Sequence, residues 1–483
     1  MDIKTQNNLL VVFFSGFFLF VCLYFFSNAD YRVLSIPLIL ATITLSIFNF
    51  KYLFYCVVFL TPLSMSLSDM GIDFSDVNMA FPTEPILFGL MILTILKIVF
   101  YPSLFKQVFQ HRVTFFILLY LFWILVTCIT SSMPIVSIKL LLTRLWYIVP
   151  VFFIGSLLFQ NKKNVDYFIL SYLIPLTIVV IYTVTRHSGY LFDKESAHYM
   201  MSPFFNDHTS YGAMIAFFLP LSIAFFWIKK HNIFFSFFMI SIILILTIGL
   251  ILSFTRAAWI SLFISVIVGL FLKFKINKTL LYSLPILGFV FLLSFQNPIL
   301  NLLESNRQDS SDNLIEHITS LSNISTDASN MERINRWKCA LKMFTEKPFF
   351  GWGPGTYQFQ YARFQLSSDR TIISSNMGDM GNAHSEYLGP LSESGFFGFL
   401  SFLILMVVTI IYAINMYYES NDSVIRTWLL AIIVALLSYA IHGLFNNFLD
   451  TDKASVAIWG VVAIIVGLDL LKDEKQSQST VIS

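Results

Sequence analysis

The sequence predicts an all-α integral membrane protein with about 14 transmembrane helices (12–14) and one large polar loop near the C-terminal end. Of its 483 residues, 57% are hydrophobic and only 12% are charged, whereas soluble domains carry roughly 25% charged residues. The apolar runs are about 16 to 22 residues long, which suits helices that cross roughly 30 Å of hydrocarbon. Strands of a β-barrel would instead be about ten residues long with alternating polarity.

Fourteen apolar segments are expected to span the membrane. The first segment follows Lys4 as a signal peptide would, but no small-residue cleavage site follows it, so it is expected to remain as a span. The boundary between neighbouring spans is least distinct within 33–68, where only Asn49 and Lys51 mark a turn. The expected spans are 9–27, 33–49, 52–68, 85–101, 114–131, 139–159, 166–185, 209–228, 233–252, 257–272, 279–295, 393–415, 427–446 and 455–471.

Basic residues predict the orientation of these spans. With both termini inside the cell, the lysines fall mainly in short cytoplasmic loops, and acidic residues such as Asp73, Glu84 and Asp207 fall on the opposite side. The polar segment 296–392 then lies outside, because an odd number of spans, about eleven, precedes it. The basic residues placed inside are Lys51, Lys106, Arg112, Lys162, Lys163, Lys229, Lys230, Lys273, Lys275, Lys278, Lys472 and Lys475.

The predicted organisation has four parts: an N-terminal transmembrane bundle over 1–295, the outer loop over 296–392, C-terminal transmembrane helices over 393–471 and a cytoplasmic tail over 472–483. A membrane-embedded chain gains little from so long a polar stretch unless the stretch folds against the membrane domain and acts there. Candidate active-site residues are therefore expected in the outer loop.

The outer loop contains a predicted amphipathic helix. Ser329 and Glu332 form a capping-box pattern, and Pro348 ends the helical pattern. Arg333 projects with the apolar stripe of this helix, near free backbone N–H groups, and this position suits a phosphate ligand. An ion pair of Arg333 with Glu332 or Asp327 is the alternative. The stripe consists of Ile334, Trp337, Leu341 and Phe344.

Two more arginines lie in or beside predicted spans. Arg256 stands in the segment 253–259, at the outer junction of two spans. It is either a functional charge or an interfacial anchor beside Trp259. Arg144 lies inside the span 139–159, where a charge is costly, and it is expected to line a cavity.

His384 is the candidate general base. It lies in Asn382–Leu388, where the outer loop returns to the membrane. A neutral imidazole with a near-neutral pKa can take a proton from a sugar hydroxyl, whereas a lysine could do so only if strongly perturbed. An ordinary hydrogen-bonding role is the alternative for a single histidine.

The sequence predicts no metal site. Asp450 and Asp452 have the D-x-D spacing of metal-binding transferases, but they occupy a short outer turn where no nucleotide sugar is available. Cys339 stands alone in the outer loop, without C-x-x-C spacing. His442 and Asn446, near the same turn, either line a polar cavity or serve the packing of the spans.

In combination these motifs resemble the O-antigen ligase and polymerase family. The resemblance is strong over about 253–400 and rests elsewhere on hydropathy. Two departures are the fourteen spans, where roughly a dozen are common, and Thr-Arg-Ala-Ala at Thr255–Ala258, where Ser-Arg-Gly-Ala is usual. The matching elements are the Arg256 segment, Arg333 with Trp337 and the following apolar positions, the run 348–355, the segment 384–388 and the segment 393–398.

The resemblance implies a multi-pass glycosyltransferase of the bacterial inner membrane that acts in lipopolysaccharide or other surface-polysaccharide biosynthesis. Its large periplasmic loop, with short amphipathic helices, would lie over the active site. The donor would be a glycan on undecaprenyl pyrophosphate, and the acceptor either lipid A-core, as in ligation, or a growing glycan, as in polymerisation. A transporter or export partner for lipid-linked glycan is the alternative, although no internal repeat supports it.

The resemblance also assigns expected roles to residues. Transfer would invert the anomeric centre without a metal or other cofactor, and no nucleic acid would take part. His384 would be the catalytic base. The pyrophosphate would be bound by Arg256 and Arg333, with Arg336 and Arg144 in reserve. The residues expected to line the cavity are Trp337, Gly353, Glu386, His442 and Asn446.

Overall fold

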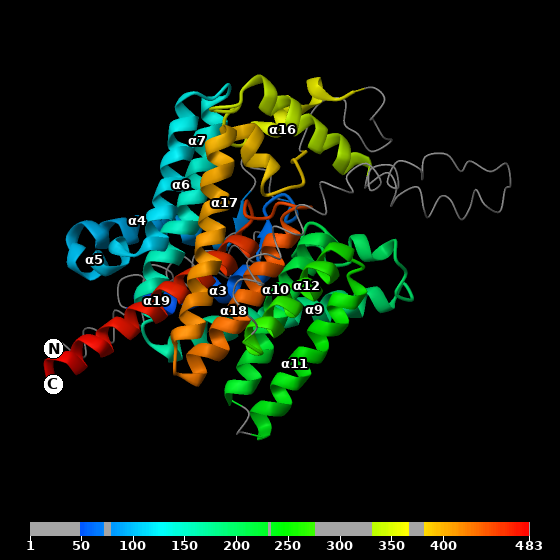
Figure 1. Cartoon of the computed structure of the whole chain (residues 1–483). Coiled ribbons are helices and arrows are strands. Elements are labelled where there is room, and N and C mark those ends of the chain that lie inside the picture. The colour runs from blue at the N-terminus through cyan, green and yellow to red at the C-terminus, as the bar shows by residue number, and fades with distance from the viewer. Residues whose placement is uncertain (1–48, 72–78, 230–232, 276–330, 367–380, 483) are drawn as a thin grey trace, which may run out of the picture. The chain divides into compact units, whose positions relative to one another are not determined.

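A computed structural model describes residues 49–71, 79–229, 233–275, 331–366 and 381–482. Within these residues ten helices are long and apolar enough to cross a membrane (Figure 1). The all-α membrane fold predicted from the sequence is thereby confirmed, and the total of about 14 spans stays a prediction. The chain divides into two units, residues 1–56 and 57–483, and all the contacts described below lie within the second.

The ten spans and the shorter elements alternate along the chain. The spans are α4 (Thr83–Phe100), α6 (Arg112–Ile129), the composite of α7 (Pro134–Ile148), η3 (Val149–Ile154) and α8 (Gly155–Leu158), α9 (Lys162–Ser188), α10 (His208–Lys229), α11 (Ile233–Leu252), α12 (Arg256–Lys273), α17 (Leu388–Glu419), α18 (Ser423–His442) and α19 (Asp452–Ile482). The shorter elements are α3 (Phe50–Leu60), η2 (Thr61–Leu63), β1 (Met65–Ser66), β2 (Ala80–Phe81), α5 (Pro102–Gln110), η4 (Ser196–His198), α16 (Tyr357–Gln360), η5 (Tyr361–Phe364) and a helix over 331–346.

Ten of the expected spans coincide with these helices, three lie outside the described residues, and one differs. The expected spans 9–27, 33–49 and 279–295 lie outside the described residues, apart from Asn49. The expected span 52–68 is instead the shorter apolar helix Phe50–Leu63. Pro62 lies in the tight 3-10 turn that ends it, after which the chain pairs β1 with β2 in an antiparallel hairpin. The membrane-spanning part of α19 ends at Lys472, and the helix continues through the expected tail as far as Ile482.

The interior of the second unit is organised around α19. Its membrane-spanning window is 94% buried, compared with 28% for α11 and α12. Glycines allow neighbouring helices to approach α19 closely: a Cβ on Gly467 would lie 2.9 Å from a backbone atom of Phe159, and Gly460 faces the ring of Phe168. Around this centre α6 packs beside α7 and α17, and α18 packs against α10 and α12 (Figure 1).

One end of the bundle gathers the described parts of the outer loop and the turns between helices that contact them, and we call it the site end. Hydrogen bonds connect Ser132 with Trp352, Thr255 with His208, and Glu386 with Gly443 at this end. The opposite end carries described basic residues of the second unit that the sequence places inside, and three of them form ion pairs there. These pairs are Lys162 with Asp422, Lys229 with Asp166, and Lys472 with Glu419.

A break in α17 receives the outer loop. Gly395 has φ +70° and ψ −170°, so the residues from Leu388 to Ser394 form a separate short helix before the long span. The N–H of Phe396 donates to the carbonyl of Pro348 at 2.8 Å. A Cβ on Gly395 would lie 2.8 Å from that same oxygen, so a residue without a side chain is required where the loop docks.

The helix over 331–346 ends before Pro348 as expected, but its buried face differs from the predicted one. Leu341, in the predicted stripe, is 47% exposed. The buried face keeps Ile334 of that stripe and also carries Glu332, Arg336, Ala340 and Met343. The buried face was predicted from the positions of apolar residues alone. It differs because the ion pair between Glu332 and Arg336 allows these two charged side chains to be buried together.

Candidate functional site

The described parts of the outer loop form a small core of their own. The helix over 331–346 packs against α16 and η5 and against the segment that carries His384. Two hydrogen bonds hold this arrangement: the hydroxyl of Tyr357 donates to the carbonyl of Arg336 at 2.8 Å, and the indole of Trp352 donates to the carbonyl of Met343 at 3.0 Å. The members of the core are Cys339, Ala340, Met343, Trp352, Tyr357, Tyr361, Phe364 and Ala383.

The run Gly351–Gly355 fastens this loop core to the membrane bundle. The hydroxyl of Ser132 donates to the carbonyl of Trp352 at 2.7 Å, and the N–H of Gly353 donates to the carbonyl of Glu393 at 2.7 Å. Gly353 has φ +113°, and a Cβ there would lie 2.8 Å from the hydroxyl oxygen of Ser137. The structure therefore places Gly353 in a close contact between the loop and the start of α7.

His384 lies in a tight turn between the loop core and α17. Its φ is +47°, its N–H donates to Oδ1 of Asn382 at 3.0 Å, and its carbonyl accepts from the indole of Trp337 at 3.4 Å. The backbone is thus held on both sides. The imidazole is half-buried and forms no hydrogen bond to any described residue. A base held by its backbone, with its ring nitrogens unengaged within the described chain, is available to a ligand.

Charges from several elements surround this imidazole. Arg333 and Arg336 from the helix over 331–346, and Asp207 from the start of α10, all act electrostatically on His384. Burial, followed by the positive charges of Arg336 and Arg333, lowers the pKa of His384 to about 4. Burial also lowers the pKa of Arg333, against the opposing effect of Asp207. His384 is therefore an uncharged base at neutral pH.

Arg336 holds the turn that contains His384 through a hydrogen bond to its backbone. Its Nε donates to Glu332 at 2.8 Å, its Nη1 donates to the carbonyl of Asn382 at 3.1 Å, and its guanidinium lies 5.0 Å from the ring of Tyr361. These contacts give Arg336 a positioning role in addition to its charge.

Glu386 and Arg144 hold the turn between α18 and α19. Glu386 accepts from the hydroxyl of Tyr439 at 2.5 Å and from the N–H groups of Phe448 and Leu449 at 2.7 and 2.9 Å. Arg144 donates to the carbonyl of Leu449 and to Asp450, both at 2.6 Å. Burial raises the pKa of Glu386. Both residues, predicted near a substrate, thus make their hydrogen bonds to protein groups in the structure, although Nε of Arg144 has no hydrogen-bond partner among the described residues.

Arg256 is different, because it is exposed at the first position of α12 and forms no hydrogen bond or ion pair with any described residue. Its neighbour Thr255 donates to the carbonyl of His208, and the backbone of Ala257 lies beside the imidazole of His442. Arg256 is therefore at the edge of the site with its guanidinium available.

His442 and Asn446 lie together at the end of α18. Both are almost completely buried, and Nδ2 of Asn446 lies 3.1 Å from Nε2 of His442. His442 also lies in the electrostatic range of Asp207 and Arg333. The structure thus brings Arg333, His384 and His442 into one charged region, and Arg256 stands next to Ala257, whose backbone contacts His442. Gly353 and Arg144 instead lie in structural contacts.

Sequence reasoning missed Asp207 as a site residue. In the sequence, Asp207 indicates only the orientation of the spans. In the structure, it acts electrostatically on His384, Arg333 and His442. Its Oδ1 accepts from the N–H of Ser210 at 2.7 Å, so it caps the start of α10. The signal in the sequence is the polar run 206–208, directly before a span, with its acid at an N-cap position.

These features define a multi-pass helical membrane protein with a charged site at one end of its bundle. Residues 241–403 match the family model described as O-antigen ligase. The match runs from α11 into α17 and contains Arg256, Arg333 and His384. This match confirms, over residues 241–403, the resemblance inferred from the sequence. Among curated proteins, none matches the chain.

The match supports a membrane enzyme of the O-antigen ligase or polymerase type and indicates a glycosyltransferase-like activity.

Proposed function

We propose that this protein transfers a glycan from undecaprenyl pyrophosphate to an acceptor hydroxyl, with His384 as general base. The observation that carries the proposal is the half-buried imidazole of His384, which has no described hydrogen-bond partner and lies within the field of Arg333. The acceptor is lipid A-core if the enzyme is a ligase and a growing glycan if it is a polymerase.

The transfer is a single displacement. The acceptor oxygen bonds to the anomeric carbon as the bond from that carbon to the pyrophosphate oxygen breaks, and the electron pair leaves with the pyrophosphate. The hydroxyl proton passes to His384. Because attack and departure occur on opposite faces, the anomeric centre is inverted. The enzyme supplies positioning, a base and charge neutralisation at the leaving group.

Arg256 and Arg333 neutralise the leaving pyrophosphate. Both can present two N–H donors to phosphate oxygens, and Arg256 has no competing partner among the described residues. In this mechanism the two guanidinium groups do what a divalent cation does in many nucleotide-sugar enzymes. Arg336 contributes its positive charge while it holds the turn at Asn382.

Binding of the donor strengthens the base. In the free enzyme the nearby arginines oppose protonation of His384, whose pKa is about 4. A pyrophosphate bound to Arg333 compensates that positive charge, and an anion near an imidazole raises its pKa. The base is thus activated only when the leaving group is in place.

The site end is proposed to face the periplasm of a bacterial inner membrane. The opposite end carries the lysines that the positive-inside rule places in the cytoplasm. A transporter would place its charged binding site near the middle of the membrane, whereas His384, Arg256 and Arg333 lie at one end of the bundle. The enzyme is therefore favoured over the transporter.

Reconstitution tests the proposal. Purified protein in liposomes, given undecaprenyl-pyrophosphate glycan and either lipid A-core or a repeat-unit acceptor, should form a product with one of the acceptors, and EDTA should not reduce the rate. The His384→Ala protein, purified in parallel, is the control for background transfer. Movement of an unchanged donor across the bilayer, without transfer, would instead support the transporter.

The glycolipid profile of a deletion strain distinguishes the two acceptors. Loss of all long glycan on lipid A-core identifies a ligase, whereas a cap of one repeat unit identifies a polymerase.

A further inference from the structure

A polar cavity of about 260 Å³ opens at the site end of the bundle. Its walls come from the segment before α10, from the turn between α18 and α19, from the start of α4 and from the His384 turn. These segments are far apart in the sequence. The proposed transfer reaction, as described above, gives this cavity no role.

The cavity adjoins His384 through two lining residues. Asn382 lines the cavity, and its Oδ1 accepts the backbone N–H of His384 at 3.0 Å. Asp207 lines it as well and acts electrostatically on His384 and Arg333. A molecule in the cavity would therefore contact two residues that hold or act electrostatically on the candidate base.

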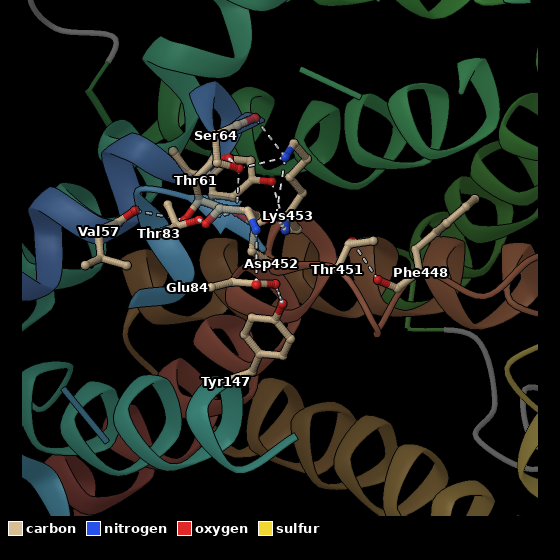
Figure 2. Close-up of polar contacts among 12 residues, drawn as sticks. Val57, Thr61, Ser64, Thr83, Glu84, Tyr147, Phe448, Thr451, Asp452 and Lys453 are labelled. Atoms are coloured by element: carbon tan, nitrogen blue, oxygen red, sulfur yellow. Dashed lines mark hydrogen bonds and ion pairs between the residues drawn. The ribbon is translucent and has the colours of Figure 1, made fainter. Parts of the chain in front are cut away.

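The far wall of the cavity is preorganised by a buried hydrogen-bond network (Figure 2). Oδ2 of Asp452 accepts from the hydroxyls of Ser64 and Thr83, both at 2.5 Å. Nζ of Lys453 donates to the hydroxyl of Ser64 at 2.7 Å and lies 3.3 Å from Oδ1 of Asp452. On the same wall, the hydroxyl of Tyr147 donates to Glu84. Side chains held in this way present fixed donors and acceptors to a ligand.

The wall chemistry fits the hydroxyls of a sugar. Amides and carboxylates both occur, and the ring of Phe448 adds an apolar surface. Oδ1 of Asn447 is buried and has no hydrogen-bond partner in the described chain, although its Nδ2 lies 3.4 Å from Asp450. A buried carbonyl oxygen without a donor is costly, and a hydroxyl in the cavity would satisfy it. The polar lining is Asn206, Asn382, Asn447, Glu84, Asp207 and Asp450, together with Asp452 and Lys453.

The charge of the cavity excludes the pyrophosphate. Among the described residues that line it, Lys453 is the one cationic residue and pairs with Asp452, and Asp450 pairs with Arg144. Glu84 and Asp207 have no such cationic partner among the ion pairs of the described residues. A phosphate or a uronic acid would therefore be repelled, whereas a neutral or amino-bearing ring would not.

We propose that this cavity binds the sugar ring of the acceptor that carries the attacking hydroxyl, and that this ring is neutral or bears an amino group. The volume is at the lower limit of the roughly 300–1,000 Å³ that hold drug-sized ligands, so it suits one ring rather than several. The assignment rests on the proposed transfer reaction, and it places the acceptor beside His384 and the donor pyrophosphate at Arg256 and Arg333.

Steady-state kinetics of two asparagine variants test the assignment. Asn206→Ala and Asn447→Ala remove cavity groups from residues that are exposed or half-buried, so folding should be retained. Each variant should raise the KM for the acceptor, lipid A-core or repeat-unit oligosaccharide, about tenfold. The KM for the lipid-linked donor should not change. Asn421→Ala is the matched control, because Asn421 is exposed at the opposite end of the bundle, and it should behave as the wild type.

The possible results distinguish a failure of the acceptor-binding assignment from a failure of the proposed transfer reaction. An unchanged acceptor KM in both variants, or an increase in the donor KM alone, would overturn the assignment while the transfer reaction stands. A wild-type protein that transfers to neither acceptor would overturn the proposed function itself. As a second arm, oxidation of the terminal primary hydroxyl of the acceptor to a carboxylate should reduce kcat/KM about tenfold or more. An equal or higher kcat/KM for the oxidised acceptor would contradict the inference that the negative charge of the cavity repels a carboxylate.

Discussion

His384 illustrates how one residue can be identified from the sequence while its behaviour depends on the fold. The motif 382–388 indicates that His384 lies where the loop returns to the membrane. From the sequence alone, its pKa is expected to be the ordinary imidazole value near 6.5. In the structure, burial and two arginines lower the pKa of His384 to about 4. Arg333 and Arg336 precede His384 by about fifty residues, so their effect on it follows only from packing.

The pH dependence of the free enzyme should reflect this shift. Protonation removes the base, so kcat/KM should decline only as the pH falls toward 4 and should show no step at pH 6.5 that depends on His384. Initial rates with both donor and acceptor well below their KM values, from pH 4 to 8, measure this profile, because bound donor would itself raise the pKa of His384. A half-maximal rate near pH 6.5 would show that the arginines do not control the imidazole.

Substitution of His384 tests the role of the base itself. His384→Ala and His384→Gln should both lose at least about a hundredfold in rate, because glutamine can accept a hydrogen bond but cannot take a proton near neutral pH. Binding of the lipid-linked donor should be retained, since the arginines remain. Transfer by the purified variants and donor binding in the same preparations are the measurements. A fully active glutamine variant would exclude His384 as the base and leave it a positioning residue.

The arginines should be sensitive to geometry as well as to charge. Arg256→Lys and Arg333→Lys keep the charge but lose the two-donor fork, so each should lower kcat/KM about tenfold, or about 1.4 kcal/mol of transition-state binding. Arg112→Lys, exposed at the opposite end, is the control and should be silent. Full activity of both lysine variants would mean that simple charge, not paired donation, serves the pyrophosphate.

At the scale of elements, boundaries could be predicted better than faces. Pro348 correctly marks the end of the helix over 331–346, because proline cannot continue a helix. The buried face could not be predicted from apolar residues, since Glu332 and Arg336 neutralise each other within it. Likewise, the sequence indicates a turn at Gly351–Gly355, but its contacts with Ser132 and Ser137 depend on the position of α7.

That turn is expected to be a point of high structural sensitivity. Gly353→Ala adds a Cβ at φ +113° against Ser131 and Ser137, so it should destabilise the docked loop by about 1–3 kcal/mol. Gly89→Ala in α4 is the matched control, because a Cβ there meets nothing within 4 Å and alanine favours a helix. Thermal unfolding of detergent-solubilised variants compares the two. Equal melting temperatures would show that the turn does not depend on this contact.

At the scale of the whole molecule, hydropathy predicts the membrane spans but not the site they create. Ten expected spans match helices because about twenty apolar residues are needed for each crossing. Asp207, Asn382 and Asn447, however, meet around one cavity from three distant segments. The sequence pattern within any one of these segments does not predict that the three residues line the same cavity. They do so because α10, α17 and α18 pack together at the site end.

The orientation of the molecule is its remaining large-scale prediction. Basic residues lie at the end opposite the site, so the site end should face the periplasm. Two exposed positions, one at each end, can report it: Glu346→Cys in the loop helix and Asn421→Cys between α17 and α18. In intact cells with a permeabilised outer membrane, a membrane-impermeant maleimide should label the first and should label the second only after lysis. The native protein measures the background from its own cysteines, of which Cys128 and Cys339 are buried. The reverse pattern would place His384 in the cytoplasm, where the proposed acceptor chemistry could not occur.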